Sequence, residues 1–197
     1  MAALEPTPGP QRPLRAHAQR NRDKLVAVAR SAFAASDDTV PLENIAREAG
    51  VGIGTLYRHF PTREALVEAV YAAELDELSA CVPDLLERLP PQVALRAWME
   101  RYAAFAVMKH GMADALRAGQ AAGRIPTATT RERITAAITA FLDAGAATGA
   151  LRADVDPEQV TMMILGIFLA TAALDTPGQI GRLLDLLVDA LHPQPAR

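Results

Sequence analysis

Hydrophobic residues recur at helical spacing along almost the whole chain. Over residues 20–35, Leu25, Val28, Ala29 and Ala32 fall on one face of a helix. The same spacing, together with capping residues and prolines, predicts further helices over residues 41–49, 53–60, 62–81, 92–110, 112–118, 128–147, 157–174 and 179–191. No useful length alternates with a period of two, so the pattern predicts an all-α protein.

Prolines interrupt this pattern at two places. Pro6, Pro8, Pro10 and Pro13 are too closely spaced for a helix or a strand, so residues 1–17 are expected to form a flexible arm. The arm is either a solvated tail or a basic segment that contacts phosphate. Pro83 is expected to end the helix over residues 62–81.

Composition narrows the class of protein. Half of the 197 residues are hydrophobic and 22% are charged, so the chain can bury a core. The one cysteine, Cys81, excludes a disulfide framework and any multi-cysteine metal site. The longest apolar run, residues 160–174, is shorter than the roughly 20 residues of a membrane span, and no secretory signal is visible. We therefore expect a soluble, cytoplasmic protein.

Charge is unevenly distributed along the chain. The net charge is −3, but residues 1–63 carry nine basic against six acidic residues, and residues 64–197 carry eleven against seventeen. Such an asymmetry can mark a nucleic-acid-binding end joined to an acidic domain. A difference this small can also arise by chance.

The segment 41–60 has the spacing of a helix-turn-helix, two short helices joined by a tight turn. Small Ala46 lets the helices cross closely, Gly50 suits the turn, and Ile45, Leu56 and Phe60 can bury against the preceding helix. The remaining face of the second helix carries four polar or aromatic residues, Thr55, Tyr57, Arg58 and His59. The second helix of such a motif can enter the major groove of DNA.

Other kinds of site fit this sequence poorly. The glycines at 50, 52 and 54 lack the Gly-Lys-Ser/Thr ending of a phosphate-binding loop and follow a helical pattern instead of a strand. The four histidines do not cluster with carboxylates, and no nucleophile–base arrangement or carboxylate pair stands out. We therefore expect no catalytic residue, no metal site and no cofactor.

Residues 40–70, VPLENIAREAGVGIGTLYRHFPTREALVEAV, closely resemble the DNA-binding segment of the TetR/AcrR family of transcriptional regulators, and the resemblance extends over residues 20–80. It implies a DNA-binding domain over residues 18–80 and a helical effector-binding and dimerisation domain over 81–197. It further implies a homodimer that binds a palindromic operator. In this family a small molecule commonly releases a repressor from its operator; activation also occurs.

The resemblance also implies which residues contact DNA: Gly52, Ile53, Gly54, Thr55, Tyr57, Arg58, His59, Thr62 and Arg63. Where the family often has Ser or Thr at the start of the second helix, this chain has Gly52 and Ile53. Ile53 cannot hydrogen-bond a base edge, so its expected target is a thymine methyl group. Base recognition is then modest and depends on apolar contact and on Arg58 or the arm.

The C-terminal half offers candidates for two further sites. Large and polar side chains that could line an effector pocket are Trp98, Phe105, Met108, Lys109, Met112, Phe141, Met162 and Met163. Residues that could form a dimer interface in the last two helices are Met163, Gly166, Ile167, Ala170, Ile180, Leu183, Leu184, Leu187 and Leu191. In both sets the alternative is that the side chains belong to the internal core.

Two other functions remain open at this stage. One is a helical enzyme or ligand-binding protein whose helix-turn-helix has lost DNA binding. The other is a protein-binding adaptor, which leaves the pattern over residues 55–63 unexplained.

Overall fold

A computed structural model of the chain describes residues 11–35, 40–110, 112–123, 125, 127–171 and 178–193. Within these ranges every regular element is an α-helix, which confirms the predicted fold class. The helices are α1 (Gln11–Ala35), α2 (Leu42–Glu48), α3 (Ile53–His59), α4 (Arg63–Arg88), α5 (Pro91–His110), α6 (Ala113–Ala121), α7 (Thr127–Thr148), α8 (Pro157–Thr171) and α9 (Gln179–Ala190).

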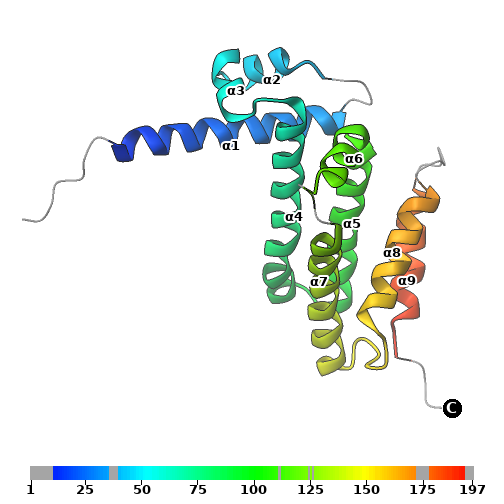
Figure 1. The fold of residues 1–197 in the computed structure, drawn as a ribbon. Coiled ribbons are helices and arrows are strands. Elements are labelled where there is room, and N and C mark those ends of the chain that lie inside the picture. The colour runs from blue at the N-terminus through cyan, green and yellow to red at the C-terminus, as the bar shows by residue number, and fades with distance from the viewer. Residues whose placement is uncertain are drawn as a thin grey trace, which may run out of the picture.

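The helices form a small N-terminal group set across the end of a longer bundle (Figure 1). Helices α1, α2 and α3 pack on one another, and α4 runs from this group along the bundle. Helices α5, α6 and α7 pack against α4, and the pair α8 and α9 packs against α7 and α5 on the far side from α4. No described helix is both long and apolar enough to cross a bilayer.

Two helices are longer than the prolines predicted. Helix α1 begins at Gln11, so residues 11–17 are helical instead of forming an arm, and residues 1–10 lie outside the described residues. Pro13 is in the first turn, where a backbone N–H has no partner within the helix, so it does not break α1.

Helix α4 continues through Pro83 to Arg88, instead of ending near Cys81. An interior proline costs about 3 kcal/mol. Burial of Val82 and Leu85 on the same helix favours its continuation. The domain boundary expected between residues 80 and 81 therefore falls inside one helix.

An aromatic cluster forms the centre of the bundle. The ring of Trp98 lies 5.5 Å from Tyr102 and 5.9 Å from Phe141, and Tyr102 meets Phe168 edge-on at 5.0 Å. The indole N–H of Trp98 donates a 2.8 Å hydrogen bond to the Leu78 carbonyl of α4. The cluster thus joins α4, α5, α7 and α8.

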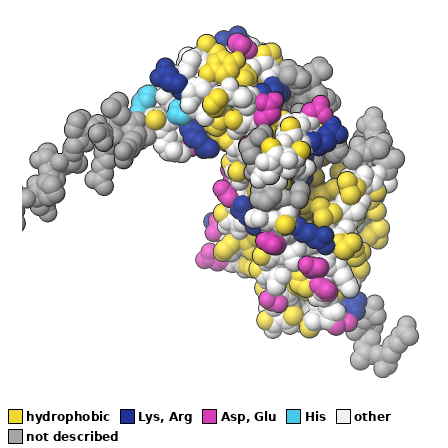
Figure 2. Space-filling view, in the orientation of Figure 1, with side chains coloured by type: hydrophobic (Ala, Val, Ile, Leu, Met, Phe, Trp, Pro, Cys, Tyr) yellow, Lys and Arg dark blue, Asp and Glu magenta, His cyan; other side chains and the backbone are white. Residues whose placement is uncertain are grey.

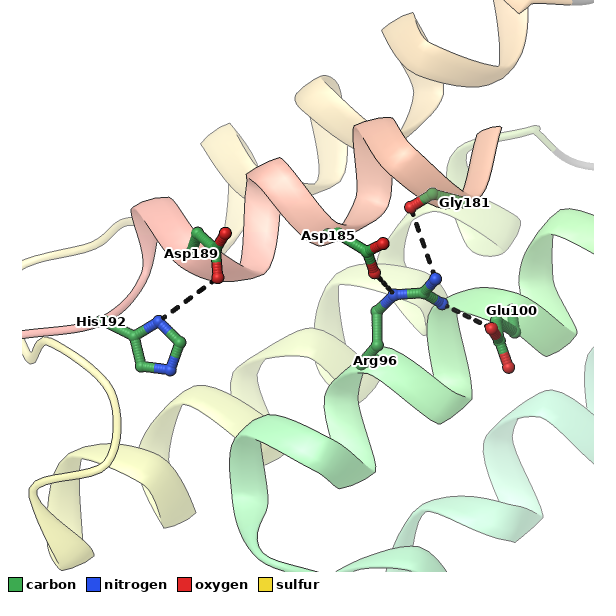
Figure 3. A network of polar contacts seen from close by, with 6 residues as sticks. All are labelled: Arg96, Glu100, Gly181, Asp185, Asp189 and His192. Atoms are coloured by element: carbon green, nitrogen blue, oxygen red, sulfur yellow. Dashed lines mark hydrogen bonds and ion pairs between the residues drawn. The ribbon is translucent and has the colours of Figure 1, made fainter. Parts of the chain in front are cut away.

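Polar contacts around Arg96 hold α9 against α5 (Figure 3). The guanidinium lies 2.6 Å from an Asp185 carboxylate oxygen and 2.9 Å from Glu100, and it donates to the Gly181 carbonyl at 3.4 Å. Beside these contacts, Leu184, Leu187 and Leu191 are buried within the chain. The three leucines are therefore core residues, which corrects their assignment to a dimer interface.

Candidate functional site

The turn between α2 and α3 has the geometry that the sequence predicts. Gly50 has a φ of +68°, in the left-handed region that favours glycine. Its N–H donates to the Arg47 carbonyl at 3.1 Å, and the Val51 N–H donates to the Ala46 carbonyl at 3.0 Å. This pair of hydrogen bonds is a Schellman motif, which closes α2 and sets the direction of α3.

One face of α3 is buried in the protein and the other is exposed to solvent. Leu56 and Phe60 are buried with Ile45 of α2, as predicted. On the outer face Ile53 and Tyr57 remain 38% and 45% exposed, although both are large hydrophobic residues. An exposed aromatic–aliphatic pair on a two-turn helix is typical of a binding surface, since a monomer gains nothing by leaving it in water.

The other predicted contact residues surround this pair. Gly52, Gly54, Arg58 and Thr62 are exposed, whereas Thr55 and His59 are partly buried. A Cβ atom added to Gly52 or Gly54 would meet nothing within 4 Å, so another molecule can approach the backbone closely at both positions.

The start of α4 is capped as predicted. Thr62 Oγ1 accepts a hydrogen bond from the Ala65 N–H at 3.2 Å. Arg63, by contrast, is partly buried and has an internal role that the sequence analysis missed. Its guanidinium donates to the Val40 carbonyl at 2.5 Å and lies 5.2 Å from the Phe33 ring centroid. Arg63 thus ties α1, the entry to α2 and α4 together, which leaves fewer of its donors for DNA.

Arg22 is a basic residue close to α3 that the sequence does not single out. It lies in α1, and its guanidinium is 5.4 Å from the ring centroid of Phe60, the residue that ends α3. An exposed positive charge is therefore placed next to the C-terminal end of the α3 surface.

A cavity of about 290 Å³ lies between α5, α6 and α8. Its apolar lining comes from Ala106, Ala113, Leu116, Leu165, Phe168 and Leu169, and its polar lining from Tyr102, Lys109, Arg117 and Gln120. In Figure 2 the surface is hollowed beside a flank of hydrophobic side chains where α8 and α9 lie. This cavity has the mixed lining of a small-molecule site.

A second cavity, of about 450 Å³, lies where α1 meets α4 and α5. It is lined by charged residues that are largely paired, since Arg30 forms ion pairs with Glu74 and Glu77. Burial raises the pKa of the Glu74 carboxyl, and the charge of Arg30 opposes that rise. This polar junction connects the N-terminal helices to the bundle.

The predicted pocket residues separate into three groups. Phe105 and Met108 line the junction cavity, and Lys109 lines the α5–α6–α8 cavity. Trp98, Met112 and Phe141 are core side chains, and Met162 and Met163 are 60% and 52% exposed and line neither cavity. None of these five residues lines either of the two cavities, because periodicity shows which residues share a face but not which helix covers that face.

The spacing of residues along the sequence could have identified more of the residues that line the α5–α6–α8 cavity. Tyr102, Ala106, Lys109, Ala113 and Leu116 follow one another three or four residues apart, the spacing of a single helical face. This continuity is hidden because α5 ends at His110 and α6 begins only at Ala113.

An apolar stripe lies on the outside of α8. It consists of Met162, Met163, Gly166, Leu169 and Ala170, all exposed, and Leu186 of α9 is also exposed. From the predicted dimer set, Met163, Gly166 and Ala170 belong to this stripe, and Ile167, Ile180 and Leu183 are partly buried beside it.

Comparison with known protein families gives a match for each half of the chain. Residues 25–70 match the family described as "Bacterial regulatory proteins, tetR family". Residues 90–193, more than half of the chain, match "Transcriptional regulator SbtR-like, C-terminal domain". The chain belongs to the TetR family of transcriptional regulators.

Solved structures agree with this TetR-family membership. A TetR transcriptional regulator from Streptomyces coelicolor is 48% identical, with a TM-score of 0.79 over 88% of this chain and 99% of that one. A TetR regulatory protein from Mycobacterium vanbaalenii is 32% identical, with a TM-score of 0.72 over 91% and 99%.

A curated relative matches a shorter part of the TetR-family chain. An HTH-type transcriptional regulator from Staphylococcus aureus is 31% identical over 78 residues, which are 39% of this chain and 41% of that protein. The match thus spans about two fifths of the length of that relative.

Proposed function

We propose that the protein is a sequence-specific DNA-binding regulator that acts in the cytoplasm, as a repressor released by a small molecule. The observation that carries this proposal is the exposed outer face of α3, where Ile53 and Tyr57 stand beside two glycines with open space above them. A helix placed in this way can enter the major groove, with Ile53 against a thymine methyl group.

The proposed regulator is a homodimer. The exposed stripe on α8 contains Gly166, where an added Cβ would meet nothing within 4 Å, so a second copy can approach closely. Two copies of α8 and α9 would form a four-helix interface. To read successive major grooves, such a dimer would hold its two α3 helices about 34–36 Å apart.

Helix α4 provides a physical route from an effector to DNA. It begins at the Thr62 cap beside α3, and along its length it contacts α5, α6 and α7. The ion pairs of Arg30 with Glu74 and Glu77 join α4 to α1. An effector that binds one arrangement of α4 better than another will change the separation of the two α3 helices and so the affinity for DNA.

The test is fluorescence anisotropy on the DNA upstream of the protein's own gene, with unrelated DNA as competitor and salt as a variable. We expect tight binding, a steep dependence on salt and a strong preference over competitor. Tyr57→Ala should weaken binding about tenfold or more, whereas Val93→Ala, an exposed site on α5, should not change it. If the wild type binds no DNA at low salt, the repressor proposal fails in favour of a ligand-binding protein whose helix-turn-helix has lost DNA binding.

A further inference from the structure

The α5–α6–α8 cavity contains an unusual charge. Lys109, one of only two lysines in the chain, is partly buried in its wall. Its ammonium lies 5.5 Å from the ring centroid of Tyr71 and 5.9 Å from that of Phe105. Among the residues that the structure describes, these two rings are its recorded partners, and no carboxylate is paired with it.

The rings do not neutralise this charge. A cation over an aromatic face gains much less than it costs to remove an ammonium from water without a counter-ion. The second cation of the lining, Arg117, is already paired with Asp114 at the exposed rim. The cavity lining includes no acidic residue. Lys109 is thus the uncompensated charge of the site.

The cavity wall also carries a hydrogen-bond donor. Tyr102 lines the same cavity, and burial raises the pKa of its hydroxyl, so the group keeps its proton. The remaining lining is apolar on α8 and mixed on α6, where Ala113 and Leu116 lie with Arg117 and Gln120. A cationic ligand would be repelled here, and a neutral one would leave the ammonium without a counter-charge.

We propose that this cavity binds a small anionic ligand with an apolar body, whose charged group pairs with Lys109 and accepts a hydrogen bond from Tyr102 while its body lies on Leu116, Leu165 and Phe168. The role of this ligand as the regulatory effector rests on the function proposed above. The selection of an anion by the cavity is independent of that function.

Binding there changes a contact of α4 directly. Tyr71, one of the two rings beneath the Lys109 ammonium, is an α4 residue, and its hydroxyl donates to Thr130 of α7 at 3.1 Å. Helix α6 also packs tightly on α4: a Cβ added to Gly119 would lie 3.1 Å from a Glu68 carboxylate oxygen. A ligand anion that draws Lys109 toward the cavity therefore weakens its contact with α4, the helix that leads to α3.

The test compares three probes that share one chain and differ in charge: octanoate, 1-octanol and octylammonium, each titrated into the full-length protein by calorimetry at neutral pH. We expect octanoate to bind at least about tenfold more tightly than octanol, and octylammonium more weakly than either. Lys109→Met should abolish the preference for octanoate while keeping octanol binding. Lys24→Met removes the other lysine, which is exposed on α1, and should leave the preference intact.

Several results would overturn the assignment: equal or tighter binding of octanol or octylammonium, no binding of any probe, or a preference for octanoate that survives Lys109→Met in a protein with unchanged circular dichroism. Anisotropy on the upstream DNA, run without probe, keeps the two proposals separate. DNA binding without anion selectivity refutes only the ligand class, and anion selectivity without DNA binding refutes only the regulator.

Discussion

Lys109 shows at the scale of one residue how a binding group can lower stability. Burial lowers the pKa of its ammonium, so the folded chain holds the charged form less well than the unfolded chain does. Between the lowered pKa and the ordinary lysine value, the unfolded state binds more protons, and stability therefore rises with pH. Below the lowered pKa both states are charged and the whole desolvation cost is present.

We predict that Lys109→Met is more thermostable than the wild type at neutral pH, because methionine fills similar space without a charge. The advantage should shrink as pH rises through the lowered pKa of Lys109. Thermal melts of both proteins across this range measure the difference in stability. Tyrosines such as Tyr71 and Tyr102 are present in both proteins, so their own titration does not account for a difference between them. A variant that is less stable at neutral pH, or a difference independent of pH, would contradict the desolvation argument.

A substitution at Gly54 should change the stability of the fold and the affinity for DNA in opposite directions. It lies inside α3 with open space around it, so Gly54→Ala should stabilise the fold by about 0.5–1 kcal/mol through helix propensity. The same methyl group would stand between α3 and the duplex and reduce DNA affinity. Urea unfolding and anisotropy on one preparation measure both effects, and equal or better DNA binding would argue against a close backbone approach at this position.

Gly50 provides the matched control in the same motif. Gly50→Ala also meets nothing within 4 Å, but its φ of +68° is unfavourable for alanine, so this variant should lose about 1–2 kcal/mol.

At the scale of elements, the sequence predicts well where the helices lie along the chain, but it predicts poorly which helices pack against one another. Ile45, Leu56 and Phe60 are buried as their spacing predicts, and Gly50 and Thr62 have the predicted turn and cap roles. The turn and the cap depend on contacts within a few residues, and the burial follows from helical spacing. They can therefore be inferred without a tertiary structure.

The wrong predictions involve contacts distant in sequence. Helix α4 continues through Pro83 because Val82 and Leu85 pack into the bundle, a contribution that local propensity omits. The leucine face of α9 is equally consistent with an internal core and with a dimer interface. Only the packing of α9 against α5 and α8 decides that Leu184 and Leu187 are internal.

The α5–α9 contact gives a prediction at this scale. Arg96 is 20% exposed in its side chain, and its partners Asp185 and Glu100 are 61% and 66% exposed, so solvent weakens both ion pairs. Arg96→Met should therefore cost only about 1–2 kcal/mol, most of it through lost packing and the bond to the Gly181 carbonyl. Arg152→Met, which removes the surface pair with Asp154, should leave the denaturation midpoint unchanged. Equal losses in the two variants would mean that Arg96 does not hold α9 in place.

At the scale of the whole molecule, the two proposed sites are far apart in sequence and joined by one helix. The α3 surface comes from one short segment, which is why a local motif can reveal it. The anion cavity takes residues from α5, α6 and α8, between Tyr102 and Leu169. Its lining can be recognised only after the helices are packed. Of the eight pocket residues that the sequence predicts, Lys109 alone lies in this lining.

Gly166 gives the sharpest test of assembly, because the fold of one chain does not need a glycine there. A Cβ added at this position meets nothing within 4 Å, and glycine inside a helix is less favourable than glutamine, so Gly166→Gln should be at least as stable as the wild type within one chain. In a dimer packed through Met163 and Ala170, the same side chain would lie between the two copies. We predict a wild-type dimer and a Gly166→Gln monomer by light scattering at micromolar concentration, with Val93→Gln on α5 remaining dimeric. The monomer should also bind the upstream DNA much more weakly, since one α3 helix cannot read two half-sites. A wild-type monomer, or a Gly166→Gln dimer, would place the subunit contact elsewhere and leave the α8 stripe without a partner.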